Sequence, residues 1–184
     1  MSAATVLPVD AQVDLPVDLA ELRRRVHAVE DPELPLLTLG QLGVIRDVRL
    51  AGDVEGGPAT VVVEVTPTYS GCPAMEVIAH DVARAVRESG YDPDVRLVLS
   101  PPWTTDWISD EGRKALQEAG IAPPARVSGP VRLELAVRRP PARPVCPQCG
   151  ATEVEELARF GSTACKSLWR CLQCREPFDY VKPL

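Results

Sequence analysis

Two Cys-x-x-Cys motifs near the C-terminus are the clearest chemical signal in the sequence. They pair Cys146 with Cys149 and Cys171 with Cys174. Two residues between paired cysteines let both thiolates reach one metal ion, and two such pairs provide the four sulfurs of a closed tetrahedral zinc site. The spacing between the pairs slightly exceeds the usual range of about 15–20 residues. The sequence therefore predicts a structural zinc site formed by these four cysteines.

The two motifs lie in a short C-terminal segment, residues 145–184, which we interpret as a zinc ribbon. Its expected strands are residues 153–160 and 167–170. A segment of roughly 40 residues buries too little apolar surface to fold alone, so metal binding would supply the missing folding energy. Two disulfides are the alternative for the same four cysteines, and they require an oxidising compartment.

A fifth cysteine, Cys165, lies between the two motifs in the string Phe-Gly-Ser-Thr-Ala-Cys-Lys, residues 160–166. It is one sulfur more than a tetrahedral site needs. One interpretation is a small buried apolar residue of the ribbon. The other is a spare thiolate, made more acidic by Lys166, that contacts a metal or cluster in transit.

Cys72 is a second centre of interest. Residues 59–66 are almost all β-branched, which predicts a strand, and this strand runs into a Gly-Cys-Pro turn at residues 71–73. Proline is favoured at the first helical position, so we expect Pro73 to begin a helix with Cys72 as its N-cap. The positive end of the helix would then lower the thiol pKa. Such a sulfur binds a soft metal or an iron–sulfur cluster, or acts as a nucleophile. A lone buried cysteine is the alternative.

Two carboxylates, Asp31 and Glu33, flank Pro32 directly after the first expected helix. On a bent loop they would share a metal ion or a basic partner. Solvated loop charges are the alternative for this pair. The sequence contains two histidines, and no Ser–His–Asp or Cys–His catalytic set can be assigned.

These residues need a scaffold, and the patterns along the chain predict an α+β domain. The expected order is helix, strand, strand, helix, strand, in a small sandwich with its helices on one sheet face. The ranges are 18–29, 44–50, 59–66, 73–89 and 94–100, with a loop or short turn at 34–43. Trp103 and Trp107 are expected to pack under a further helix at about 109–119, with a partner-binding patch as the alternative, and a last strand is expected at 131–137.

We divide the chain into four parts. Residues 1–17 form a disordered lead-in, residues 18–137 the main domain with its extension, residues 138–144 a proline- and arginine-rich linker, and residues 145–184 the zinc ribbon that follows it.

Composition excludes several classes of function. The formal net charge is −6, which argues against a nucleic-acid partner, because phosphate binding relies on clustered Lys and Arg. No stretch approaches the roughly 20 apolar residues of a membrane span. The N-terminal residues lack the basic start of a signal peptide, so we expect a cytoplasmic protein with reduced thiols.

Residues 18–100 resemble the SufT-like (MIP-type) iron–sulfur assembly family. The resemblance rests on the Asp31-Pro-Glu33 loop and on the segment from Thr66 to the Gly71-Cys72-Pro73 turn. It implies that Cys72 handles iron–sulfur clusters, helped by Asp31 and Glu33, with Cys165 as a second sulfur. A cluster would then be bound transiently, beside one structural zinc ion.

The C-terminal part resembles one subfamily, the D subunits of bacterial phenylacetyl-CoA epoxidases. Residues 160–166, Cys171 and residues 174–180 carry this similarity. It implies a non-catalytic accessory subunit in aerobic phenylacetate degradation, which assists assembly or repair of the iron–sulfur cluster of the reductase component. The sequence agrees, since it has no Glu-x-x-His pair for a diiron site and no flavin or nicotinamide fingerprint.

The implied partners are the iron–sulfur/flavin reductase and the other epoxidase subunits. Whether the chain also forms a homo-oligomer is left open by the sequence. Two alternatives remain. One is a purely architectural subunit of the epoxidase. The other is a zinc-ribbon regulator that binds nucleic acid, which the acidic charge disfavours.

Overall fold

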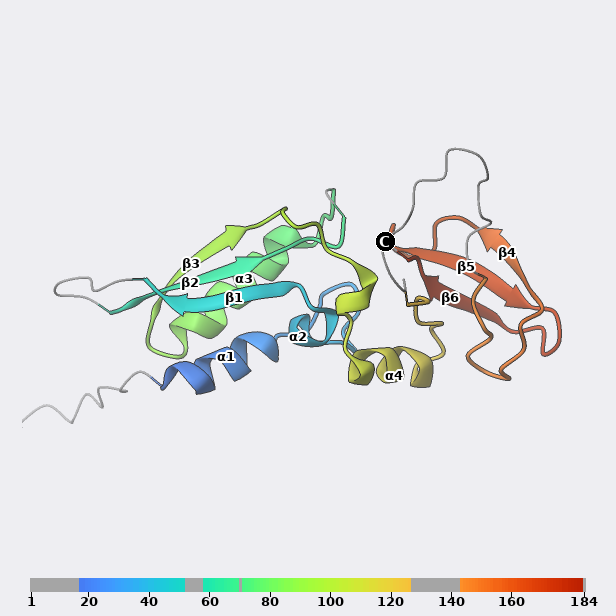
Figure 1. Cartoon of the computed structure of the whole chain (residues 1–184), viewed down its shortest axis with the longest axis horizontal. Coiled ribbons are helices and arrows are strands. Elements are labelled where there is room, and N and C mark those ends of the chain that lie inside the picture. Colours follow the sequence, from blue (N-terminus) through green and yellow to red (C-terminus); the bar gives the residue numbers. More distant parts are fainter. Residues whose placement is uncertain (1–16, 52–57, 70, 127–142, 184) are drawn as a thin grey trace, which may run out of the picture.

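The computed structural model describes residues 17–51, 58–69, 71–126 and 143–183. In this part of the chain two three-stranded sheets are present, and each has its own cluster of buried apolar residues (Figure 1). The strand expected at 131–137 and most of the expected lead-in and linker lie outside the described residues.

The first sheet belongs to the α+β domain that the sequence predicts. In chain order the elements are α1 (Leu19–His27), α2 (Leu39–Leu42), β1 (Ile45–Leu50), β2 (Thr60–Val65), α3 (Met75–Arg87) and β3 (Asp92–Leu97). The strand order is β1-β2-β3, with β1 antiparallel to β2 and β2 parallel to β3. The predicted order of helix, strand, strand, helix, strand is confirmed.

The core of this domain lies between the sheet and its two longer helices. Alternate residues of β2, namely Val61, Val63 and Val65, are at most 2% exposed and face α1 and α3. The helices contact each other and contribute buried residues at helical spacing, among them Leu22 and Val82. The opposite face of the sheet carries the buried Val62 and charged side chains, with an ion pair of 2.9 Å between Arg49 and Glu64.

One short helix, α2, replaces the loop expected at 34–43. Thr38 caps it: its hydroxyl accepts from the backbone N–H of Gln41, whose side chain accepts from the N–H of Thr38. Gly43 ends it at φ 71°. Four residues are too few for a periodic pattern, and the Thr38-x-x-Gln41 capping box, which is a local signal for a helix start, was not recognised in the sequence.

The aromatic segment after β3 packs around the end of α2. Trp103 is buried, and its indole N–H donates to the carbonyl of Leu42 at 2.9 Å. A 3₁₀ turn, η1 (Thr105–Trp107), and α4 (Asp110–Glu118) follow. The expected packing role of Trp103 is confirmed.

The second sheet is the ribbon, with antiparallel strands in the order β4-β5-β6. These strands are β4 (Val154–Ala158), β5 (Lys166–Cys171) and β6 (Pro177–Val181). The sequence predicted the first two and missed β6. The rings of Trp169 and Tyr180 meet edge to face at 6.2 Å inside the ribbon's own small core.

The first domain and the ribbon each contribute a buried residue to the core of the other. Ala122, after α4, pairs in parallel with β6: its N–H donates to Asp179 O at 2.8 Å and its carbonyl accepts from Val181 N–H at 3.1 Å. Ala122 is buried in the ribbon core, whereas Val181 is buried in the core of the first domain. The ribbon is therefore docked on the segment that follows α4 (Figure 1).

Candidate functional site

The four cysteines of the two motifs meet at one end of the ribbon. Their sulfur atoms all lie within 4.8 Å of one another. The Sγ–Sγ distance is 3.7 Å for Cys146 and Cys174, and 3.6 Å for Cys149 and Cys171. A zinc tetrahedron with Zn–S bonds of about 2.3 Å has sulfurs about 3.8 Å apart, so the donor set fits zinc.

Both motifs close with the same backbone turn. The N–H of Gly150 donates to Cys146 O at 2.9 Å, and the N–H of Arg175 donates to Cys171 O at 3.1 Å. Gly150 has φ 76° and Arg175 has φ 69°, so each turn ends in a left-handed residue. The backbone N–H of Cys174, 3.5 Å from Cys171 Sγ, lowers the pKa of the Cys171 thiol to about 7.

Cys165 lies outside this cluster, at the other end of β5. All six cysteines of the chain are free thiols in the structure. Cys165 directly precedes β5, while Cys171 ends it, so this one strand connects the four-cysteine cluster to a second site.

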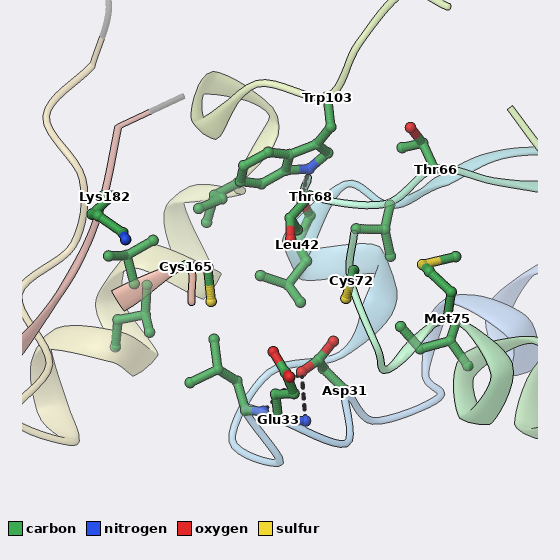
Figure 2. Close-up of a pocket in the computed structure, with 16 residues that line it drawn as sticks. Asp31, Glu33, Leu42, Thr66, Thr68, Cys72, Met75, Trp103, Cys165 and Lys182 are labelled. Carbon is green, nitrogen blue, oxygen red and sulfur yellow. Dashed lines mark hydrogen bonds between the residues drawn. The ribbon is translucent and has the colours of Figure 1, made fainter. Parts of the chain in front are cut away.

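The second site is a cavity between the first domain and the ribbon (Figure 2). The four residues that the sequence suggested for iron–sulfur handling, Asp31, Glu33, Cys72 and Cys165, all line it. The space open to water-sized groups is about 30 Å³. The remaining lining is largely apolar and includes Leu34, Leu42, Val44, Met75, Ile78, Trp103, Ile108, Leu116 and Val181.

Asp31 holds the acidic loop in place. It is buried, and its Oδ1 accepts from the backbone N–H groups of Glu33 at 2.9 Å and Leu34 at 2.8 Å. Burial raises the pKa of this carboxyl, although the two N–H donors act in the opposite direction. The alternative, a solvated loop charge, is therefore wrong for Asp31.

Glu33 is half-buried on the same loop. Its pKa is raised, first by burial and then by the nearby Asp31 carboxylate, while Lys166 of the ribbon acts in the opposite direction. The two carboxylates lie next to each other below the two sulfurs in Figure 2.

The position expected for Cys72 requires a correction. Helix α3 begins at Met75 with Ala74 as its N-cap, so Cys72 lies in the preceding turn. The thiol is half-buried, and this burial raises its pKa, with further contributions from Glu33, Asp31 and Cys165. The Ala74 N–H acts in the opposite direction but does not compensate. Desolvation and neighbouring carboxylates outweigh the helix terminus, so the predicted lowering of the pKa is wrong.

For Cys165, the interpretation as a thiol made more acidic by Lys166 is wrong in the same way. Burial raises the pKa of its thiol, and the opposing effect of Lys166 is smaller. The ammonium group of Lys166 is buried and forms an ion pair with Asp179 at 3.2 Å. The Thr163 hydroxyl lies 3.0 Å from Cys165 Sγ.

Sequence reasoning assigned no role to three polar residues of the cavity, Thr66, Thr68 and Lys182. Thr66 is 1% exposed, and its hydroxyl has no hydrogen-bond partner among the described residues. Lys182 follows β6, with its ammonium group 4.3 Å from the centre of the Phe160 ring. Thr66 and Thr68 lie in the segment between β2 and Cys72, whereas Lys182 reaches the cavity only because the ribbon docks there, which no local signal marks.

The fold and the two thiol sites define the class as an iron–sulfur assembly domain joined to a zinc ribbon. Two protein-family models match the chain. The family described as iron–sulfur cluster assembly protein matches residues 19–98, and the family described as PaaD zinc beta ribbon domain matches residues 134–182.

Among curated proteins, one from Escherichia coli (strain K12) is named as the D component of a 1,2-phenylacetyl-CoA epoxidase. It is 42% identical over 91% of this chain and 94% of its own. The chain belongs to the family of these epoxidase D components.

Two shorter relatives match the first domain. The Fe-S protein maturation auxiliary factor YitW of Bacillus subtilis (strain 168) is 32% identical over 50% of this chain and 85% of its own. The Fe-S protein maturation auxiliary factor SufT of Staphylococcus aureus (strain USA300) is 36% identical over 48% of this chain and 96% of its own. In the part of the chain that the structure describes, no helix is long and apolar enough to cross a membrane.

Proposed function

We propose that the protein is an accessory subunit of a phenylacetyl-CoA epoxidase that assists assembly or repair of the iron–sulfur cluster in the reductase component. The observation that carries the proposal is the convergence of Cys72, Cys165 and the Asp31–Glu33 loop on one cavity. Thiolates are the protein ligands that iron–sulfur clusters use. The names of the relatives support the same role, since one is an epoxidase component and two are maturation factors.

In this proposal Cys72 is the exchangeable sulfur. Because its pKa is raised, it rests as a thiol and becomes a thiolate when metal displaces the proton. Asp31 fixes the loop through its two N–H contacts, and Glu33 and Cys165 face the same cavity from the two domains. The chain itself carries out no reaction on phenylacetyl-CoA.

The four-cysteine cluster has a separate, structural role. We propose that Cys146, Cys149, Cys171 and Cys174 hold one zinc ion, which supplies folding energy to a ribbon with a small core. The ribbon then closes one side of the Cys72 cavity and presents a surface to the client protein. Six free thiols agree with a reducing compartment, and we propose the cytoplasm.

The test replaces the chromosomal gene of the host with one encoding Cys72→Ala. The reductase purified from this strain should be deficient in iron and acid-labile sulfide, and growth on phenylacetate should be poor. Purified cluster-loaded reductase should restore epoxidation in extracts, because the defect lies upstream of the chemistry. A strain with Glu76→Gln, an exposed change on the first turn of α3, serves as control.

A full cluster in the reductase from the Cys72→Ala strain would reject the assembly role. A purely architectural subunit would then be the better description. Salt-dependent affinity for nucleic acid would favour the regulator instead.

A further inference from the structure

The cavity between the two domains is too small for a preassembled cluster in this conformation. Its space for water-sized groups is about 30 Å³. One ordered water needs about 10–15 Å³ on the same measure, so the cavity holds about two such groups. A [2Fe–2S] cluster contains four inorganic atoms and takes four protein ligands. The cavity lining offers two cysteines, Cys72 and Cys165.

The donors of the cavity suit a single divalent cation. Cys72 approaches from the turn before α3, Cys165 from the segment before β5, and Glu33 from the loop after α1 (Figure 2). Two thiolates and the Glu33 carboxylate would bring three negative charges to one divalent ion, and the lining also includes the positively charged Lys182. Neutrality matters here because most of the lining is apolar, and an unbalanced charge is costly in such surroundings.

We propose that the cargo of this site is a single ferrous ion, bound by the sulfurs of Cys72 and Cys165 and by a carboxylate oxygen of Glu33. This inference rests on the proposed function and specifies what the site carries. Each thiol releases one proton to solvent as its Fe–S bond forms, and no electron is transferred. Asp31 is a positioning residue, because its Oδ1 is already engaged by two backbone N–H groups.

The site differs from the ribbon cluster in a way that suits a cargo. In the four-cysteine cluster all ligand atoms lie within 4.8 Å of one another, and among the described residues no second group of three or more ligands is gathered so closely. The cavity donors therefore have to move inward on the ion. A site that is not preformed binds more weakly and releases its ion more readily.

Anaerobic equilibrium dialysis against Fe²⁺ tests the inference with zinc-loaded full-length protein. We expect one iron per chain in addition to the zinc, without acid-labile sulfide. With Co²⁺ as a spectroscopic substitute, a thiolate-to-cobalt charge-transfer band should appear while zinc is retained. Cys72→Ser and Cys165→Ser should each weaken binding at least tenfold and remove part of this band. The exposed changes Glu76→Gln and Ser162→Ala are matched controls and should leave both readouts unchanged.

Two outcomes would overturn the inference. In one, Fe²⁺ and Co²⁺ bind with unchanged affinity to both cysteine variants. In the other, neither ion binds, while iron and sulfide together load two irons and two sulfides on the wild type. The second result would leave the assembly role intact, since the cluster content of the reductase in the Cys72→Ala strain tests that role independently.

Discussion

Cys165 and Cys171 lie at opposite ends of one strand, β5, and serve two different sites. Cys171 belongs to the four-cysteine cluster, whereas Cys165 lines the cavity that contains Cys72. The fold of the ribbon therefore determines the shape of the Cys72 site. A change at one end of β5 should be measurable at the other.

Removing a zinc ligand should abolish zinc binding and open the cavity. Cys146→Ser and Cys174→Ser should each reduce zinc from about one per chain to well below it, because three thiolates leave the tetrahedron incomplete. Elemental analysis and circular dichroism measure the loss. Alkylation of Cys72 should become faster in both variants, because Val181 and Lys182 no longer cover it.

Cys165→Ser is the control for this prediction. Its sulfur is not part of the cluster, so zinc should stay at about one per chain. Zinc loss in this variant would mean that Cys165 is a ligand. In Cys146→Ser and Cys174→Ser, by contrast, the ribbon unfolds. The unfolding free energy of the first domain should then fall by about 1.5–3 kcal/mol, since Val181 is buried in its core.

Cys72 should be alkylated more slowly at neutral pH than a free cysteine. Its raised pKa keeps the reactive thiolate scarce, so the rate should rise only as the pH passes above the usual value of about 8.5. Glu33→Gln removes a negative charge that disfavours the thiolate, and should speed alkylation severalfold at pH 8. Peptide mapping of zinc-loaded protein measures the rate at this residue.

Glu76→Gln makes the same charge change on an exposed residue of α3 and should leave the Cys72 rate as it is. A Cys72 rate above that of free cysteine in the wild type would contradict the raised pKa and restore the expectation drawn from the sequence.

Asp31 should act through its hydrogen bonds rather than its charge. Asp31→Ala leaves two N–H donors without a partner, that of Leu34 being buried, and should cost about 1–3 kcal/mol of unfolding free energy. Asp31→Asn keeps the accepting oxygen and should be at least as stable as the wild type at pH 7. Urea denaturation measures both.

The pH dependence follows from the sign of the shift. Burial raises the pKa of Asp31 in the folded state, so the folded protein binds the proton more tightly than the unfolded chain. Asp31 therefore costs stability as the pH rises from its unfolded value of about 3.9 through the raised folded value. The difference in unfolding free energy in favour of Asp31→Asn should grow across that window. If the unfolding free energies of the two proteins depend on pH in the same way, the raised pKa of Asp31 is rejected.

Gly43→Ala should destabilise the junction between α2 and the aromatic segment. Gly43 has φ +71°, and an added Cβ would lie 2.6 Å from Trp107 O. Both the left-handed backbone and the contact are unfavourable, so we expect a cost of about 2–4 kcal/mol. Gly120→Ala is the matched variant: at φ +76° its Cβ would meet only the end of the Gln148 side chain. It should cost about 1–2 kcal/mol, and equal costs would mean that the Trp107 contact yields easily.

Local patterns by themselves determined most of the scaffold. The β-branched run before Thr66 predicts β2, the spacing of Leu22 and Val26 predicts α1, and the two Cys-x-x-Cys turns predict the cysteine cluster. Each signal is contained within a few residues, since strand alternation, helical spacing and turn chemistry depend on near neighbours. The short helix α2 was missed because four residues show no periodicity and its Thr38-x-x-Gln41 capping box was not recognised.

Only the tertiary structure decided how the thiols behave. Cys72 and Cys165 share a cavity because Val181 is buried in the first domain and Ala122 pairs with β6. Their pKa values rise because burial removes both sulfurs from water and the carboxylate of Glu33 lies near both of them. Desolvation and Coulomb interactions depend on distances across the fold, which the order of residues along the chain does not contain.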